Sequence, residues 1–440
     1  MSRKLVDRGV DWIGLVPENW EFQKGKYLFR QRIERGNRKE LQLLSPTQKY
    51  GCIPQSLYEE LTGANAVKLN EKTDLNMLKT IHVGDFCISL RSFQGGFEYS
   101  EYEGVVSPAY QVFYPICNNI HRGYYKYMFK DGAFIDKMNS FTLSLRDGKN
   151  IAFDDFGDTL LPLPPLEEQH AIADYLNKKT SEIEAAIKEA QELIDKYKAY
   201  KQSVIIETVT KGLNPHVAMV DSGIEWIGQI PAHWKVVPFR SYTIERAEKN
   251  KGEKTRELLA LSYALGVTLY RDKVFNMDRV KDDYEDYQLV YENDLVLSPN
   301  DIIKGSVYVS KYFGCISPMY NVFSARNPKT HYLPYLSYLL RTKEAGWKFF
   351  FIARGLIGGI SNTGKYVTRR MTVSRQDLMS FKVLLPSYEE QLAIVEYLDN
   401  KCSQIDTIIA QKETLISQLQ EYKKSIIFEY VTGKKEVPNG

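Results

Sequence analysis

Two long stretches of the chain carry the most regular alternation of apolar and polar positions. They follow Pro165 and Ser387, open with pairs of glutamates, and contain no Gly or Pro until Gly212 and Gly433. Acidic residues in a first turn favour the positive end of a helix dipole. The pattern therefore predicts two helices of about 43 residues, each ~65 Å long at 1.5 Å per residue. A helix of that length extends beyond one small core.

The apolar positions of these helices recur in steps of four and three. The first seam is Leu176, Thr180, Ile183, Ile187, Ala190, Ile194, Tyr197, Lys201 and Val204, and the second is Leu398, Cys402, Ile405, Ile409, Lys412, Ile416, Leu419, Lys423 and Ile426. A seam sustained over about four heptads favours a coiled coil over an amphipathic helix on a globular core. We expect the two helices to pair with each other, antiparallel if the halves are related by a two-fold axis.

Three segments of the chain occur twice, which indicates domain duplication. Asp7–Trp20 (DRGVDWIGLVPENW) matches Asp221–Trp234 (DSGIEWIGQIPAHW). Leu163–Ile187 (LPPLEEQHAIADYLNKKTSEIEAAI) matches Leu385–Ile409 (LPSYEEQLAIVEYLDNKCSQIDTII). The shorter pair is SPAYQVF, residues 107–113, and SPMYNVF, residues 317–323. The offsets of 214, 222 and 210 differ as loop insertions would make them differ.

Between the repeated segments lie two variable parts with short β-rich runs and helix-prone stretches, typical of α+β domains. Residues 85–90 and 294–298 are expected strands, and 335–343 is an expected helix. The predicted organisation is an N-terminal segment 1–20, a first globular domain 21–161, a central helical region 162–213, a second N-terminal-type segment with its globular domain 214–383, and a C-terminal helical region 384–440.

Composition narrows the functional classes. The 440 residues are 43% hydrophobic and 26% charged, and the formal charge of +3 requires any nucleic-acid surface to be local. The five cysteines form no CxxC pair and the six histidines show no metal spacing, which argues against a zinc site or a disulfide framework. We read no signal peptide and no membrane span, and expect a cytoplasmic protein.

Two segments resemble catalytic or nucleotide-binding motifs, but each lacks a residue that the motif requires. The stretch GGISNTGKY, residues 358–366, approaches a phosphate-binding loop, but Tyr366 stands where that loop needs Ser or Thr. The SPAY and SPMY segments approach the active-site turn of amino-methyltransferases, but Ala109 and Met319 replace its second proline. We interpret SPAY and SPMY as structural strand starts.

Local basicity with interleaved aromatics is the remaining signal. Residues 24–39 hold seven Lys or Arg against one acid, and residues 240–256 hold six against three. A solvated surface is the plain alternative for one such run, but two at corresponding places favour DNA phosphates. Polar loops at 91–96, 144–150 and 300–305 add side chains suited to base edges. The candidate DNA-binding residues are Arg30, Arg32, Arg35, Arg38, Lys39, Arg91, Gln94, Arg146, Lys149, Arg246, Lys249, Lys251, Lys254, Asn300, Lys304, Asn362, Lys365, Arg369 and Arg370.

The duplicated D-x-G-x-x-W-I-G-x-[VI]-P-x-x-W motif, the duplicated LP-x-x-EEQ helix start, and the tail ends YKQSVIIETVTKG and YKKSIIFEYVTG together resemble the specificity (S) subunit of type I restriction–modification enzymes. The resemblance covers the chain from Asp7 to about Lys434. It implies two target recognition domains that each read half of a split DNA target, and an antiparallel coiled coil that sets their spacing.

The resemblance also implies the partners and their cofactors. Similar proteins hold two modification (M) subunits, which use S-adenosylmethionine to methylate adenine at N6, and two restriction (R) subunits, which use ATP and Mg²⁺. The S subunit itself then has no catalytic residue, metal or cofactor. Rival hypotheses are a coiled-coil adaptor that binds only protein, an active methyltransferase, and a specificity variant that never assembles with M.

Overall fold

The computed structural model describes residues 3–438, apart from 37–40, 65–74, 89–95, 142–150, 152, 264, 274–282, 356–358, 361–365 and 368–370. Two compact units are present. Unit 1 comprises residues 1–191 and 413–440, and unit 2 comprises residues 192–412. Each unit is a mixture of helices and antiparallel strands, so the predicted α+β class is confirmed.

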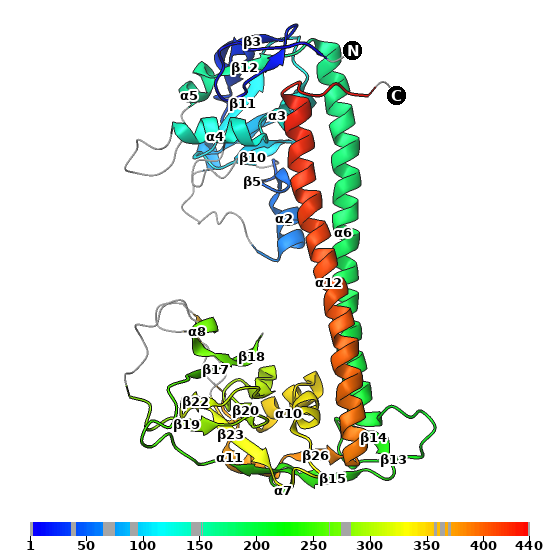
Figure 1. Cartoon of the computed structure of the whole chain (residues 1–440). Helices are drawn as coiled ribbons and strands as arrows, with labels where there is room; N and C mark the ends of the chain where they lie inside the picture. Colours follow the sequence, from blue (N-terminus) through cyan, green and yellow to red (C-terminus); the bar gives the residue numbers. More distant parts are fainter. Residues whose placement is uncertain are drawn as a thin grey trace. The chain divides into compact units, whose positions relative to one another are not determined.

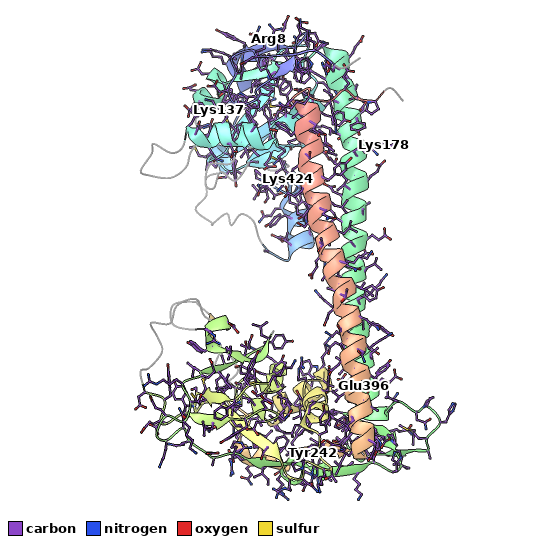
Figure 2. The ribbon with its side chains drawn as sticks, viewed as in Figure 1. Arg8, Lys137, Lys178, Tyr242, Glu396 and Lys424 are labelled. Carbon is purple, nitrogen blue, oxygen red and sulfur yellow. The ribbon has the colours of Figure 1, made fainter. Side chains whose placement is uncertain are left out.

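Both long helices exist and each contributes a segment to both units. Helix α6 (Leu166–Lys211) has 46 residues and helix α12 (Tyr388–Val431) has 44, slightly more than the predicted 43. Within each unit the two segments lie side by side and run antiparallel (Figure 1). In unit 1 the rings of Tyr175 and Tyr430 are 4.5 Å apart, and Lys423 is paired with Glu184 at 2.5 Å. The Lys178, Glu396 and Lys424 side chains project from the helices into solvent (Figure 2).

The same ion pair recurs in unit 2 with the helices exchanged. Lys201 of α6 is paired with Asp406 of α12, with 2.6 Å between Nζ and Oδ2. Lys201 and Lys423 are equivalent positions, as are Glu184 and Asp406, at the repeat offset of 222. The lysine that occupies the same position in both seams therefore has an acidic partner on the opposite helix.

Each unit contains a four-stranded antiparallel sheet of identical order. The sheet of unit 1 runs β4 (Phe29–Gln31), β11 (Gln111–Pro115), β8 (Phe86–Ile88), β9 (Phe97–Tyr99). The sheet of unit 2 runs β16 (Thr243–Glu245), β23 (Asn321–Ala325), β20 (Leu295–Leu297), β21 (Val307–Val309). The strands expected at 85–90 and 294–298 are thus β8 and β20.

Two-stranded ladders and short helices complete the units. The ladders of unit 1 are β1 (Leu5–Val6) with β2 (Val16–Pro17), β3 (Glu21–Lys24) with β12 (Leu160–Leu163), β5 (Leu44–Thr47) with β6 (Gly51–Pro54), and β7 (Lys79–Ile81) with β10 (Gly104–Val106). Its short helices are α1 (Gly25–Leu28), α2 (Gln55–Thr62), η1 (Leu75–Met77), α3 (Arg122–Met128), α4 (Gly132–Ser140) and α5 (Phe153–Asp158).

Unit 2 repeats the four ladders in the same chain order and adds a fifth, β24 with β25. Its ladders are β13 (Met219–Asp221) with β14 (Gln229–Pro231), β15 (Lys235–Pro238) with β26 (Lys382–Leu385), β17 (Leu259–Ser262) with β18 (Gly266–Leu269), β19 (Gln288–Val290) with β22 (Gly314–Ile316), and β24 (Gly359–Ile360) with β25 (Tyr366–Val367). Its short helices are α7 (Phe239–Tyr242), α8 (Tyr270–Lys273), η2 (Ile302–Lys304), α9 (Leu333–Leu340), α10 (Lys343–Ile352) and α11 (Arg375–Ser380). The expected helix at 335–343 is α9, which ends before Thr342 caps α10.

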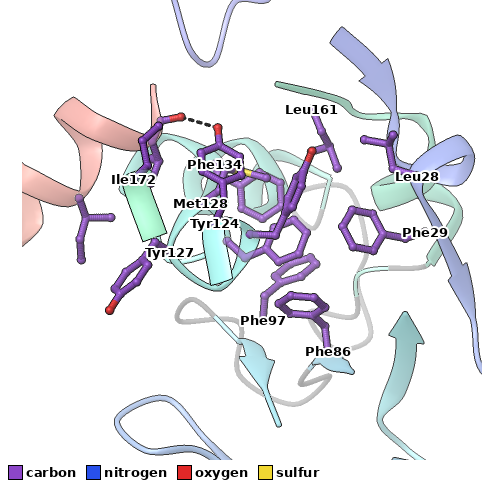
Figure 3. Packing of buried hydrophobic residues seen from close by; sticks show 14 of the residues in the cluster. Leu28, Phe29, Phe86, Phe97, Tyr124, Tyr127, Met128, Phe134, Leu161 and Ile172 are labelled. Carbon is purple, nitrogen blue, oxygen red and sulfur yellow. Dashed lines mark hydrogen bonds between the residues drawn. The ribbon is translucent and has the colours of Figure 1, made fainter. Parts of the chain in front are cut away.

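An aromatic core fixes the sheet of unit 1 to its helices. Phe29 packs against Phe86, Phe113 and Tyr125, with ring centroids 5.9, 5.5 and 5.1 Å apart and nearly perpendicular planes (Figure 3). Edge-to-face pairs contribute about 0.5–1.5 kcal/mol each beyond their buried area. The same core includes buried residues of α6 and α12, such as Ile183. The globular part and the helix segments of unit 1 therefore share one hydrophobic core.

The SPAY, SPMY and GGISNTGKY segments lie at turns and strands, which agrees with a structural interpretation. The SPAY and SPMY segments form turns directly before β11 and β23, with hydrogen bonds of 3.0 and 3.1 Å from Tyr110 N to Ser107 O and from Tyr320 N to Ser317 O. Gly359 and Ile360 pair with Val367 and Tyr366 in a β-hairpin. A strand, rather than the helix of a phosphate-binding loop, thus follows residues 361–365.

Candidate functional site

In unit 1, the described residues that border the three candidate segments lie at the same end of the sheet. After β4 ends, Arg32 N donates to Val112 O at 2.8 Å. At the end of β8, Ile88 pairs with both Phe97 and Gln111. The Gln111 Nε2 then donates to Ile151 O at 3.3 Å, directly after residues 142–150. The segments that follow β4, join β8 to β9, and precede Ile151 therefore start or end together.

Unit 2 repeats the arrangement with different side chains. After β16, Arg246 N donates to Val322 O at 2.8 Å. Leu297 of β20 pairs with Val307 and Asn321. Asn300, in the β20–β21 connection, accepts a hydrogen bond of 2.6 Å from the Thr372 hydroxyl, and Val373 N donates to Pro299 O at 3.1 Å. Thr372 and Val373, which follow the candidate segment, are thus anchored beside the β20–β21 connection.

Several candidates belong to these segments but lie outside the described residues. They are Arg38, Lys39, Arg91, Gln94, Arg146 and Lys149 in unit 1, and Asn362, Lys365, Arg369 and Arg370 in unit 2. Their assignment to DNA stays a prediction that rests on where their neighbours lie.

The described lysines and two of the arginines are on the surface. Arg30, Arg35 and Lys251 are exposed. The other surface lysines have acidic neighbours: Lys249 pairs with Asp286 at 2.9 Å, Lys254 with Glu248 at 2.7 Å, and Lys304 with Asp301 at 3.7 Å. Exposed ion pairs contribute only about 0–1 kcal/mol. Exchanging such a partner for a DNA phosphate therefore costs little.

Arg32 and Arg246 have a different environment from the other candidates. Arg246 Nε and Nη2 donate to the two carboxylate oxygens of Asp294 at 2.7 and 3.0 Å, and its guanidinium lies 4.5 Å from the Tyr291 ring centroid. Arg32 makes the same pair with Asp85 at the same distances. Each arginine directly follows β4 or β16, and its carboxylate partner directly precedes β8 or β20. Each pair therefore links two strands of one sheet, which is a structural role.

The electrostatics of the second pair follow from burial. Only 3% of the Asp294 side chain is exposed. Burial raises the pKa of Asp294, and hydrogen bonds from Arg246 and from Tyr291 N oppose that rise. The hydrogen bond to Asp294 raises the pKa of Arg246 in turn. A buried carboxylate of this kind depends on its arginine to stay charged.

The repeated motifs meet at the start of each long helix. In unit 1, Trp20 Nε1 donates to Glu168 Oε2 at 3.0 Å, and in unit 2, Trp234 Nε1 donates to Glu390 Oε1 at 3.1 Å. Burial opposes ionisation of Glu390, but hydrogen bonds from His233 and Trp234 outweigh it and lower its pKa. The glutamates therefore do more than complement the helix dipole, because each binds the tryptophan of its N-terminal motif.

The seam residues lie between the two helix segments of each unit. Leu176, Ile183, Ile194, Leu398, Ile405 and Ile409 are buried, and Ile187 and Ile416 are half-buried. In the part of the chain that the structure describes, no three His, Cys, Asp or Glu side chains are grouped to hold a metal ion. Among the same residues, no helix combines the length and the apolar character needed to cross a membrane.

Part of the chain is similar in sequence to proteins of known family. A family model described as type I restriction modification DNA specificity domain matches residues 17–193. The chain is 27% identical over 301 residues to the type I restriction enzyme MjaVIII specificity subunit of Methanocaldococcus jannaschii, covering 64% of each chain. Residues 17–193 therefore carry a type I restriction–modification DNA specificity domain. The chain spans about two thirds or less of the length of the curated relatives it matches.

Solved structures of specificity subunits share the fold. A chain from a structure concerning complex assembly and conformational transition of the type I R-M system matches with a TM-score of 0.67 at 13% identity, over 96% of this chain and 99% of the other. The HsdS subunit from Thermoanaerobacter tengcongensis matches with a TM-score of 0.53 at 14% identity, over 96% and 98%. These likenesses confirm the predicted fold, in which α+β domains are combined with two long helices.

Proposed function

We propose that this chain is a specificity subunit, the non-catalytic DNA-recognition component of a type I restriction–modification complex. Each recognition domain reads one half of a bipartite target. The observation that carries the proposal is the convergence of three candidate segments at one end of the sheet, repeated in both units. Surface lysines there supply phosphate contacts, and polar side chains of unlike sequence supply base contacts.

The helices set the distance between the two half-sites and receive the partner subunits. A 46-residue helix measures ~69 Å, and half-sites one DNA turn apart lie ~34 Å from centre to centre. The helix pair is thus long enough for the spacer and for docking of M subunits. Two tethered half-sites also multiply their discrimination, since each specified base pair contributes only about 1–3 kcal/mol.

Chemistry in this proposal belongs to the partners in the cytoplasm. Two M subunits methylate adenine at N6 with S-adenosylmethionine, and R subunits add ATP- and Mg²⁺-dependent restriction. Methylation requires the adenine to be flipped out of the duplex. The specificity subunit contributes by holding the duplex while M acts.

The test is a genome-wide map of adenine methylation in cells that express this chain together with its M partner. We expect one split site with two unlike halves, because the segments RSFQGG and SPNDIIKG differ between the domains. Removing one heptad from both helices at equivalent positions should shorten the spacer. Cells with M alone are the control. A palindromic site, or methylation that does not depend on this chain, would contradict the proposal.

A further inference from the structure

The glutamine of the first EEQ motif joins the recognition domain of unit 1 to helix α6. Gln169 is fully buried. Its Oε1 accepts from His121 N at 2.8 Å, and its Nε2 donates to Asn119 O at 2.9 Å and to Pro164 O at 2.8 Å. His121 and Asn119 precede α3 of the recognition domain, whereas Pro164 precedes α6. Both N–H donors of the amide and its carbonyl oxygen are therefore hydrogen-bonded. We call this contact between the domain and the start of the helix the joint.

The glutamine of the second EEQ motif makes the same contacts in unit 2. Gln391 is also fully buried. Its Oε1 accepts from Tyr332 N at 2.8 Å, and its Nε2 donates to Thr330 O and to Pro386 O, both at 3.0 Å. The recognition-domain partners are shifted by 211 residues between the copies and the helix partners by 222. The same three contacts are thus made in both units, although the domain residues and the helix residues are separated from their counterparts by different numbers of residues.

A second attachment fixes each domain elsewhere on its helix pair. Tyr124 OH donates to Val431 O at 2.7 Å in unit 1, and Tyr335 OH donates to Val209 O at 2.8 Å in unit 2. The domain is therefore fixed to the start of one helix and to the end of the other. If the glutamine contacts were lost, the domain would remain attached at the tyrosine and share the same core.

We propose that Gln169 and Gln391 are positioning residues that set the angle of each recognition domain on the helix pair, and so restrict the spacer length of the DNA target. The inference rests on the proposed function. An amide fixed by three hydrogen bonds of 2.8–3.0 Å tolerates little rotation of the domain, because such bonds weaken steeply with misalignment. A domain that lacks this joint is held by the tyrosine, the shared core and the Trp–Glu hydrogen bond, which permit a small tilt, and a tilt moves its half-site along the duplex.

The two joints are not identical, which provides an internal comparison. In unit 2 the Tyr242 hydroxyl also donates to Gln391 Oε1. The position equivalent to Tyr242 in unit 1 is Leu28, at the offset of 214. Tyr242→Phe therefore removes a contact that unit 1 lacks and leaves the three shared hydrogen bonds. We expect it to preserve the spacer.

The experiment compares Gln391→Met with wild type in the complex with M, using a library of split sites whose spacers differ by one base pair. Wild type should methylate one spacer length. Gln391→Met should methylate the neighbouring lengths several-fold better relative to the preferred length. Gln404→Met, an exposed glutamine of the same helix, is the matched control and should behave as wild type.

Gln391→Glu supplies a readout that a merely structural role does not move. Burial and the facing carbonyl oxygens of Thr330 and Pro386 favour the protonated carboxyl group, which regains one donor. Spacer selectivity of this variant should therefore improve as the assay pH falls from about 8 to about 6. Wild type measured over the same pH range is the baseline, and the improvement should be specific to Gln391→Glu.

The outcomes separate the two proposals. If wild type methylates no split site, the proposed function fails. If wild type has one spacer length and both Gln391 variants keep it, with methylation reduced only in proportion to folded complex, the glutamines are structural and this inference is wrong. Hydrogen exchange at the Tyr332 amide, which should accelerate in Gln391→Met, establishes that the contact itself was removed.

Discussion

Replacing Arg246 with alanine separates a structural role from a DNA contact. The substitution removes two charge-assisted hydrogen bonds and the contact with the Tyr291 ring, and leaves Asp294 with one backbone partner, Tyr291 N at 2.8 Å. Breaking a buried pair by removing one partner costs about 3–5 kcal/mol. Because 27% of the Arg246 side chain is exposed, water reaches the site, so we expect the lower end, about 3 kcal/mol.

The assay is urea unfolding followed by hydrogen exchange in peptides that cover β16 and β20. Arg246→Ala should lower the unfolding midpoint of unit 2 and accelerate exchange in both strands. The double variant Arg246→Met, Asp294→Leu should recover much of the loss, since an apolar pair of similar volume often replaces a buried ion pair without cost. The matched control is Lys251→Ala, in an exposed turn, which should change stability by less than about 0.5 kcal/mol.

In a DNA-binding assay we expect the reverse order: Lys251→Ala should have the larger effect on binding and Arg246→Ala the smaller one. If Lys251 contacts a phosphate, Lys251→Ala should reduce the salt slope of binding by about 0.9. If Arg246→Ala instead keeps wild-type stability and exchange and loses one unit of salt slope, then Arg246 binds DNA and the structural interpretation is wrong.

Two further predictions concern unit 1 and its counterpart positions. Gly433 has φ +68°, and a Cβ there would lie 2.8 Å from Trp20 Cζ2, whereas the nearest atom to a Cβ at Gly212 is 3.2 Å away. Gly433→Ala should therefore destabilise its unit more than Gly212→Ala does, by urea midpoint, and equal losses would contradict this. Burial and the His170 ring, 3.9 Å away, lower the pKa of His121. The folded state then binds fewer protons, so unit 1 should lose stability as pH falls below about 6.5; His121→Gln should lessen that loss, and an unchanged pH profile would refute it.

The helices were predictable because their signals are local. The glutamates after Pro165 and Ser387, the absence of Gly and Pro, and the four-three seam all lie within one continuous stretch, and each reports helix formation on its own. The duplication was predictable for a related reason, since comparing the chain with itself needs no structure. Pairing of the helices within one chain followed from the duplication together with the seam.

The roles of individual polar residues were not predictable because their partners are distant in sequence. Arg32 reads as part of a basic run, yet its carboxylate partner, Asp85, is 53 residues away. Gln169 reads as a polar residue in a helix start, yet its partner His121 is 48 residues away. The only available signal for Gln169 was its recurrence as Gln391, which marks a shared requirement without saying what the requirement is.

The atoms used at the joint have a consequence for how such a chain changes over time. On the domain side, Gln169 binds the main-chain N–H of His121 and the main-chain carbonyl of Asn119. Every amino acid except proline offers both groups. A domain of entirely different sequence can therefore make the same hydrogen bonds to Gln169, provided that its main chain occupies the same position. Under the proposed function, exchange of whole domains would then change the target preference, while the helices that receive them stay as they are.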